Sequence, residues 1–365
     1  IANGPNNHLL PPPQTTPGWV LSVDIDNHDG IAQTPAVGLN LRAEPKRDAK
    51  IIGLIPAATP LFITDEAQGE FTPVRVANET LQPAPAEPYI TEPSMLGQAR
   101  LGLHAAADPD ISEAEHQEFA ELRPAIIKVL SFHSHEDIQR LAQAHPRATW
   151  VVRTFLHFGG RRIAPSQFLR DTFPDTERAL EALANRDVVI ELHNEPNLAP
   201  EGLYSSWSDA SAFNTWWLEL LDLYQQRLPD QRFIFPGLSP GASVSNLKID
   251  HIQFLEACRP AIQAADGLGV HLYWSNVYPM QRALDVLDDI ISRFRNTPIW
   301  ITEASNNKSG TTVHHKAQQY LDFWHALQTR PIVQGVTYFV ASASNPLFAE
   351  EVWVGRGLGK LVGQR

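Results

Sequence analysis

The stretch Asp187–Asn197, which reads Asp-Val-Val-Ile-Glu-Leu-His-Asn-Glu-Pro-Asn, decides the expected fold and site. It is a strand-like apolar run that ends at a carboxylate, Glu195. The stretch Pro298–Ser305, Pro-Ile-Trp-Ile-Thr-Glu-Ala-Ser, has the same character, and its apolar run ends at Glu303. Ionised side chains are costly in apolar surroundings, so a buried strand that ends in a carboxylate is unusual. Two such strands predict a pair of carboxyl groups that face each other across a cleft.

The chain around these two runs alternates between strand-like and helix-like segments from about Met95 onward. One helix-like segment is Phe213–Gln226, whose apolar residues recur at spacings of three or four. Eight strand candidates follow one another: Ala99–Ala105, Ala125–Phe132, Thr149–Leu156, Val188–His193, Arg232–Phe235, Leu268–Trp274, Ile299–Thr302 and Val333–Val340. Eight β/α repeats predict an α/β protein whose residues 95–365 form a (β/α)8 TIM barrel, the catalytic domain. Both glutamates then lie where strands end, which is the active-site end of such barrels.

The first 94 residues have a different composition, because 14 of the 29 prolines lie in the first 93 residues. Residues 1–17 are expected to form an extended arm, and the prolines of residues 81–94 predict a semi-rigid linker. Between them, short β-like runs separated by turn residues predict a small all-β domain over residues 18–80. Its stretch Gly38–Pro56 resembles the bacterial SH3-like family, although the closing Gly-Trp strand of that family is missing. The resemblance implies either contact with cell wall or glycan or a structural appendage.

Composition restricts the partners of this chain. The 365 residues are 43% hydrophobic and 19% charged, which is typical of a globular protein. The formal net charge of -12, without a basic stripe, argues against a nucleic-acid partner and suits a neutral substrate such as a glycan. No apolar run reaches 18 residues, so no membrane span is expected. The numbering begins at Ile1 rather than Met, which favours a processed chain and a secreted or extracytoplasmic location.

The motif Asn194-Glu195-Pro196-Asn197 on the fourth strand, together with Glu303 on the seventh, resembles clan A of the retaining glycoside hydrolases. The resemblance covers the whole barrel in strand order. It implies that Glu195 is the acid/base and Glu303 the nucleophile of a double displacement on a β-linked oligo- or polysaccharide. Retaining enzymes hold these groups about 5–5.5 Å apart, whereas about 8 Å implies inversion. The expected reaction needs neither a metal nor an organic cofactor.

Three further residues have roles implied by the same resemblance. The sixth strand carries His271 and Tyr273, where clan members place a His/Tyr pair close to the nucleophile. Tyr273 is expected to donate a hydrogen bond to Glu303, and His271 to contact the substrate or orient the acid/base. Asn194 is expected to bond the sugar hydroxyl next to the reacting carbon, a contact that strengthens in the transition state.

Strand alternation predicts a charge network below these groups. If Glu195 points inward, then so do His193 and Glu191, since alternate residues of a strand share a face. A lone buried carboxylate at Glu191 is strongly disfavoured. Lys128 on the second strand and Arg153 on the third each interrupt an apolar run and are its natural partners. Clan members usually carry an arginine on the second strand, so the lysine there departs from the pattern.

Aromatic residues near the strand ends are candidates for stacking against sugar rings. Trp274 follows the sixth strand, where core packing and sugar binding are equally good interpretations, and Trp207 lies with Tyr204 in the loop after the fourth strand. Trp353 follows the eighth strand, where the clan often places a tryptophan. Trp217 belongs to an apolar helix face and is expected in the core.

Two other functions stay open on the sequence alone. A metal-dependent amidohydrolase barrel would use histidines such as His104, His133 and His135 as metal ligands. A glycan- or cell-wall-binding protein with a decayed barrel would bind sugar without turnover. The loop Leu198–Ser211 is the expected specificity element, but the sequence does not name the sugar. Cys258, the single cysteine, lies in a helix-like stretch and is expected to be an inert buried thiol.

Overall fold

The computed structural model describes residues 15–21, 26–28, 31–33, 39–45, 51–56, 59–64, 67–68, 71–77, 82–83, 99–275 and 277–364. The chain divides into two compact units, Ile1–Ser94 and Met95–Arg365.

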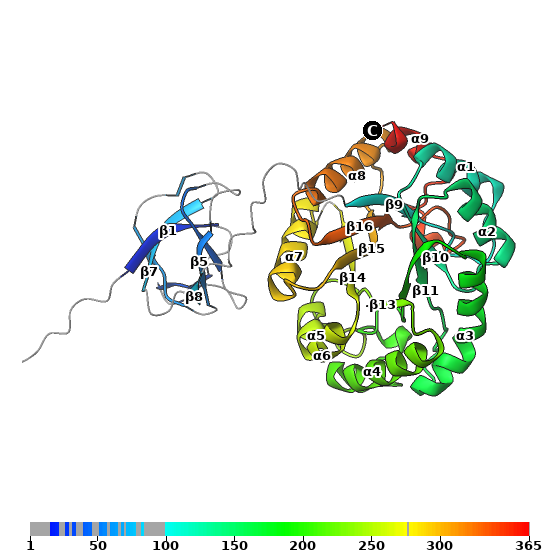
Figure 1. Cartoon of the computed structure of the whole chain (residues 1–365). Coiled ribbons are helices and arrows are strands. Elements are labelled where there is room, and N and C mark those ends of the chain that lie inside the picture. Colours follow the sequence, from blue (N-terminus) through cyan, green and yellow to red (C-terminus); the bar gives the residue numbers. More distant parts are fainter. Residues whose placement is uncertain are drawn as a thin grey trace, which may run out of the picture. The chain divides into compact units, whose positions relative to one another are not determined.

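The second unit contains a closed barrel of eight parallel strands, in which β9 to β16 follow the order of the sequence and β16 pairs with β9 (Figure 1). The strands are β9 (Arg100–His104), β10 (Ile126–Leu130), β11 (Thr149–Arg153), β12 (Asp187–Glu191), β13 (Arg232–Phe235), β14 (Gly267–Trp274), β15 (Ile299–Asn306) and β16 (Val333–Tyr338). Each strand predicted from the sequence corresponds to one of these, so the predicted TIM barrel is confirmed.

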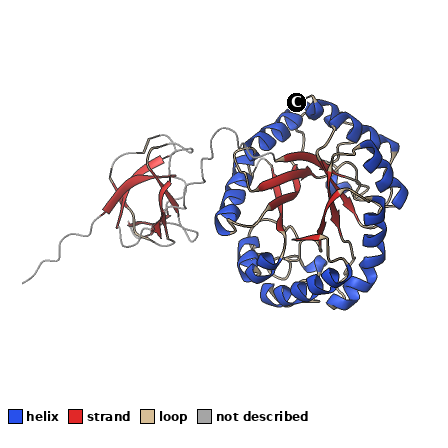
Figure 2. Ribbon diagram, in the orientation of Figure 1, coloured by secondary structure: helices blue, strands red, loops and turns tan. Residues whose placement is uncertain are grey.

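Helices form a ring around the strands (Figure 2). They are α1 (Glu113–Leu122), α2 (His135–Ala144), α3 (Pro165–Ala182), α4 (Ala210–Arg227), α5 (His251–Ala257), α6 (Arg259–Ala264), α7 (Met280–Arg293), α8 (Val313–Leu327) and α9 (Leu358–Gly363). Polar side chains fix several helix starts: Ser112 forms a capping box with Glu115 at α1, and Asp209 accepts from the N–H of Ala212 at α4. No helix among the described residues is long and apolar enough to cross a membrane.

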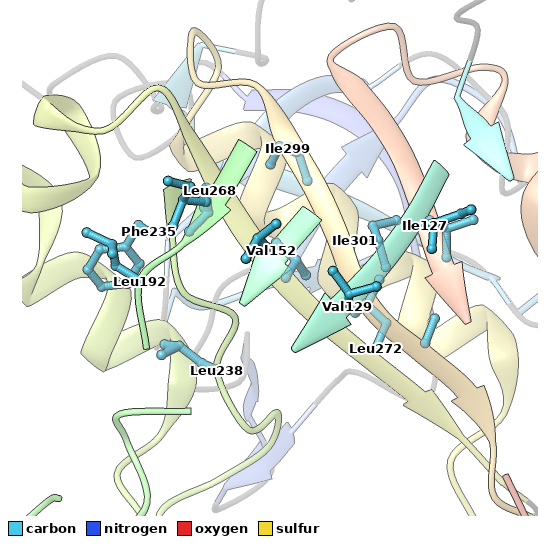
Figure 3. Close-up of a cluster of buried hydrophobic side chains, with 14 of the residues drawn as sticks. Ile127, Val129, Val152, Leu192, Phe235, Leu238, Leu268, Leu272, Ile299 and Ile301 are labelled. Carbon is cyan, nitrogen blue, oxygen red and sulfur yellow. The ribbon is translucent and has the colours of Figure 1, made fainter. Parts of the chain in front are cut away.

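Alternation along the strands separates two apolar layers. One layer packs between the strands and the helices, and Figure 3 shows part of it, including Val129, Val152 and Ile301. The other layer is a separate cluster of residues that alternate with the first: Ile126, Val151, Val189, Ile234 and Trp300. Two positions further along their strands than Ile126, Val151 and Val189 come Lys128, Arg153 and Glu191. Inside the barrel, a polar layer therefore lies above this apolar cluster, nearer the carboxyl ends of the strands.

The first unit contains a six-stranded sheet in the order β6-β7-β1-β4-β5-β8 and a two-stranded sheet of β2 and β3. These strands are β1 (Thr15–Leu21), β2 (Asp26–His28), β3 (Ile31–Gln33), β4 (Leu39–Arg42), β5 (Ile51–Ile55), β6 (Phe62–Ile63), β7 (Phe71–Ala77) and β8 (Gln82–Pro83). Strand β1 begins at Thr15, inside the range expected as an arm. The rest of that arm, and the expected linker beyond β8, lie outside the described residues, and the SH3-like assignment stays a prediction.

Candidate active site

Glu195 lies in the loop after β12 rather than on the strand, so strand alternation does not determine the direction of its side chain. Strand β12 ends at Glu191, and the positive φ angles of His193 (85°) and Glu195 (38°) turn the chain. The backbone N–H of Glu195 donates to the carbonyl of Gly237 at 2.9 Å, which fixes the turn. The prediction that His193 points inward with Glu191 is wrong. The His193 ring lies outside the barrel interior instead, within 6 Å of aromatic rings that include Phe168 (5.7 Å).

A β-bulge sets the direction of Glu303. The sequence predicts that this strand ends at Glu303, but β15 continues to Asn306. In the pairing with β14, Val270 is opposite Ile301, and the next residue, His271, is opposite Glu303. One extra residue, Thr302, therefore stands on β15, and a bulge of this kind redirects the side chains around it. As a result Thr302 and Glu303 both face the barrel interior, although they are neighbours in sequence.

The two glutamates meet at His271 on β14. Its Nδ1 lies 2.9 Å from Oε1 of Glu195 and 3.6 Å from Oε2 of Glu303. One oxygen of each carboxyl group and a ring nitrogen of His271 all lie within 4.8 Å of one another. The hydroxyl of Tyr273, two residues further along β14, donates to Oε2 of Glu303 at 2.6 Å. The fold therefore brings together four side chains that were predicted from the sequence, those of Glu195, Glu303, His271 and Tyr273.

The predicted charge network is present below this group. Lys128 Nζ lies 2.8 Å from Oε2 of Glu191 and 3.2 Å from Oε1 of Glu303. Arg153 lies 3.5 Å from the same Glu303 oxygen, so this arginine pairs with Glu303 rather than with Glu191. The other Glu191 oxygen accepts from the Thr302 hydroxyl at 2.7 Å. Two buried cations thus pair with two buried carboxylates, and this pairing offsets the cost of removing the four charges from water.

This environment controls the ionisation of Glu303. Burial alone would raise the pKa of its carboxyl group, but His271, Lys128 and Arg153 outweigh burial and hold that pKa below its usual value. Burial and the Glu303 charge raise the pKa of Tyr273 well above its ordinary value, so its phenol stays protonated and can donate. Glu303 is therefore a carboxylate with fixed donors around it.

A family match shows which group of proteins this chain belongs to. Residues 170–356, just over half of the chain, match the family described as glycosyl hydrolase catalytic core. The chain belongs to this family. The protein is therefore a glycoside hydrolase, and the residues that the family covers include both glutamates, His271 and Tyr273. No curated protein sequence matches this chain.

Solved structures that resemble this glycoside hydrolase are distant in sequence. An endo-beta-1,3-glucanase from Pseudomonas viridiflava is 17% identical, with a TM-score of 0.47, and the match covers 73% of this chain and 97% of that one. A curdlan-specific exo-beta-1,3-glucanase from Blastomyces gilchristii is 16% identical, with a TM-score of 0.47 and coverages of 73% and 98%. An endo-beta-1,4-glucanase from Xanthomonas axonopodis pv. citri is 11% identical, with a TM-score of 0.46 and coverages of 73% and 100%.

The three tryptophans considered for sugar stacking are all buried. Trp207 is 3% exposed, and its indole N–H donates to the carbonyl of Pro196 at 2.9 Å. Trp274 is 2% exposed and stacks on Phe323 of α8, with ring centroids 4.9 Å apart. Trp353 is fully buried among tyrosines. The expectation that Trp207 or Trp353 stacks on sugar is therefore wrong, and of the two interpretations of Trp274 the structure supports core packing. These rings support loops and helices. Trp217 lies in the core, as predicted.

Exposed aromatic rings lie instead at other positions in the loops that follow the strands. Phe155 follows β11, Tyr204 follows β12 and Tyr278 follows β14, and they are 41%, 51% and 39% exposed. The sequence analysis singled out only Tyr204 of these three.

The histidines considered for a metal site do not gather. Among the described residues, the one group of three or more potential metal ligands within reach of one another is Glu195, His271 and Glu303. His133 has both ring nitrogens beside the backbone: Nδ1 accepts from the N–H of Leu130 at 3.3 Å, and Nε2 lies 3.1 Å from the carbonyl of Ala106. The arrangement of His104, His133 and His135 required by an amidohydrolase is thus not formed.

Asn194 is held by a carboxyl group that the sequence analysis did not single out. Its side-chain Nδ2 donates to Oε1 of Glu201 at 3.3 Å, while its buried Oδ1 has no hydrogen-bond partner in the described part of the chain. Glu201 lies in a short 3-10 helix, η3 (Ala199–Glu201), within the predicted specificity loop. Burial raises the pKa of Glu201 to about 7. No sequence pattern marks this glutamate, since its burial depends on how the loop folds.

Replacing Lys128 by methionine tests the network. The change leaves Glu191 and Glu303 without their shared cation, and breaking a buried pair typically costs about 3–5 kcal/mol, so urea unfolding should show a loss of this size. The acid limb of kcat/KM should also move to higher pH, because Lys128 is one of the charges that lower the pKa of Glu303. Arg140→Ala removes the exposed pair with Glu113 and serves as the control, with no measurable change expected. An unchanged unfolding midpoint in Lys128→Met would contradict the prediction.

Proposed function

We propose that this glycoside hydrolase retains the anomeric configuration of its substrate, with Glu303 as the nucleophile and Glu195 as the acid/base. The observation that supports the proposal is the proximity of the two carboxyl groups, because one oxygen of each belongs to a group of atoms that all lie within 4.8 Å of one another. Retaining enzymes hold their carboxyl groups about 5–5.5 Å apart, and inverting enzymes about 6.5–9.5 Å apart to admit a water molecule.

The proposed reaction has two displacements. A carboxylate oxygen of Glu303 attacks the anomeric carbon and forms an ester bond, while the glycosidic bond breaks and Glu195 gives its proton to the departing oxygen. In the second step Glu195 accepts a proton from water, the water oxygen attacks the same carbon, and the ester bond returns its electron pair to Glu303. No redox change occurs, and the net reactant is one water molecule.

The surroundings of the two glutamates support these different roles. Glu303 lies 7% exposed between Lys128 and Arg153, with the Tyr273 hydroxyl on its other oxygen. These contacts stabilise a negative charge that must persist until attack. Glu195 has 18% of its side chain exposed, which gives the leaving group and then water access to its proton. The His271 ring between them limits the movement of both carboxyl groups.

We further propose that the substrate is a β-linked oligo- or polysaccharide. The clan A likeness of the motif around Asn194 and Glu195 supports the β configuration. The exposed rings of Phe155, Tyr204 and Tyr278 in the loops after three strands support an extended sugar chain, because pyranose faces pack against aromatic rings. Contact of the N-terminal domain with a cell wall, and a location outside the cytoplasm, also stay proposals, which glycan pull-down of the whole protein and fractionation of source cells would check.

Following the configuration of the first product tests the proposed mechanism. Proton nuclear magnetic resonance of a β-glycoside digest should show the β-anomer first, followed by slow mutarotation. A 2-fluoro glycosyl fluoride, which slows the second displacement, should label the peptide that contains Glu303. Early appearance of the α-anomer, or a label on another residue, would overturn the assignment.

A further inference from the structure

The loop after β12 places Glu201 at a defined position. Gly202 follows it with φ of 117°, and a Cβ added there would lie 2.4 Å from the Trp207 ring, so only glycine fits. Backbone hydrogen bonds close the same turn, from the N–H of Glu201 to the carbonyl of Leu198 at 3.1 Å, and from the N–H of Leu203 to that carbonyl at 3.2 Å. The backbone of Glu201 therefore has a defined position in the loop.

The contact between Glu201 and Asn194 decides how the Asn194 amide is oriented. An ionised carboxylate only accepts hydrogen bonds, so it draws the Nδ2 end of the amide toward itself. The Oδ1 end then faces away, where it is buried and unpartnered among the described residues. Buried polar atoms in native proteins normally have a partner. A hydrogen-bond donor for Oδ1 would therefore have to come from outside the described residues.

A small recess lies beside this pair. Its lining includes Thr154 and Phe155 as well as Asn194 and Glu201. Asn194 immediately precedes Glu195, so a donor that reaches its amide lies next to the reacting bond.

The charges around Glu201 keep it near the point of titration. Burial raises its pKa, Arg153 from β11 opposes that effect, and the carboxylates of Glu195 and Glu303 add to it, with a result of about 7. His193, whose pKa is lowered to about 3 by burial, stays neutral beside the same loop. Near neutral pH the carboxyl group therefore exists in both forms. The protonated form can donate a hydrogen bond and no longer fixes the amide in one orientation.

We propose that Glu201 is a positioning residue, whose carboxylate turns the Asn194 amide so that Oδ1 accepts from the sugar hydroxyl next to the reacting carbon. The inference rests on the proposed function of the site and adds a residue to it. Glu201 itself need not touch the sugar. Its contribution is to keep one of the two amide orientations, and so to keep a contact that strengthens as the transition state forms.

A double-mutant cycle tests this role. Glu201→Ala is expected to lower kcat about 10-fold with KM little changed, since a hydrogen bond to a charged group is stronger than one between neutral groups and this one acts in the transition state. In the Asn194→Ala background the same substitution should have no further effect, because Glu201 acts through Asn194. Equal losses in both backgrounds, or unchanged kcat in Glu201→Ala, would overturn the proposal.

Glu201→Gln is a second variant of the same shape that does not titrate. Its amide can donate to Oδ1 as a protonated carboxyl would, so it should resemble the wild type at pH 5.5 and fall about 10-fold below it at pH 8.5. A ratio of wild type to variant that is constant across this range would overturn the proposal. Failure of this inference is distinguishable from failure of the proposed function, because the wild type would then still hydrolyse glycosides and still depend on Glu303.

Discussion

Glu303→Ala is expected to lower kcat on a β-glycoside at least about 10⁴-fold, the scale of loss found when a catalytic nucleophile is removed. The truncated side chain leaves space below the anomeric carbon, flanked by Lys128, Arg153 and the Tyr273 hydroxyl. A small anion such as azide fits this space and its charge. Added azide should therefore restore turnover and yield the α-glycosyl azide, since a single displacement inverts the configuration.

Glu219→Ala provides the matched control, because this glutamate is exposed on α4 and should leave kcat unchanged. Thermal unfolding of Glu303→Ala identifies a folding defect separately from lost chemistry. Normal turnover in folded Glu303→Ala would refute the nucleophile assignment.

Glu195→Ala is expected to lose more activity on substrates whose leaving group is more basic, because such a group must be protonated as it departs. General acid catalysis typically contributes about 10²–10⁴-fold, so hydrolysis of a natural glycosidic bond should fall by this amount. A dinitrophenyl glycoside, whose leaving group departs without a proton, should still form the glycosyl-enzyme and give a burst of dinitrophenol. Azide should then attack that ester and yield the β-glycosyl azide.

The two azide products separate the roles of the glutamates. If Glu195 were the nucleophile, the configurations would be exchanged between the two variants. A loss in Glu195→Ala that is equal for both leaving groups would contradict an acid/base role. Product configuration can be read from the anomeric coupling constant in each case.

The barrel and the meeting of the two glutamates could be predicted from one-dimensional patterns, whereas the contacts of His271 and Tyr273 with them were implied by the resemblance to clan A. Apolar runs of strand length alternating with helical periods specify the eight strands. His271 and Tyr273 share a face because they are two positions apart on one strand. Lys128 could be predicted as a partner of Glu191 because it interrupts an otherwise apolar strand.

The remaining features depend on relations that a single sequence does not contain. The bulge at Thr302 is a property of pairing between β15 and its neighbours, so alternation along β15 alone gives the wrong direction for Glu303. The reversal of His193 follows from positive φ angles in a loop. Position after a strand makes Trp207 and Trp274 candidates for sugar binding, but their exposure is set by which helix or loop packs over them. The contact of Glu201 with Asn194 could not be predicted, because it depends on how the loop folds.

In the proposed mechanism, the ion pair of Lys128 with Glu191 has a consequence for the lifetime of the covalent intermediate. When Glu303 becomes an ester it loses its charge, and Lys128 would be stranded without a counter-ion if Glu191 were absent. Glu191 keeps Lys128 neutralised, while Arg153 is left beside an uncharged ester oxygen. That uncompensated cation makes the ester a better leaving group, because its departure restores the missing anion. In the proposed mechanism this arrangement favours cleavage of the ester, by which Glu303 regains its charge.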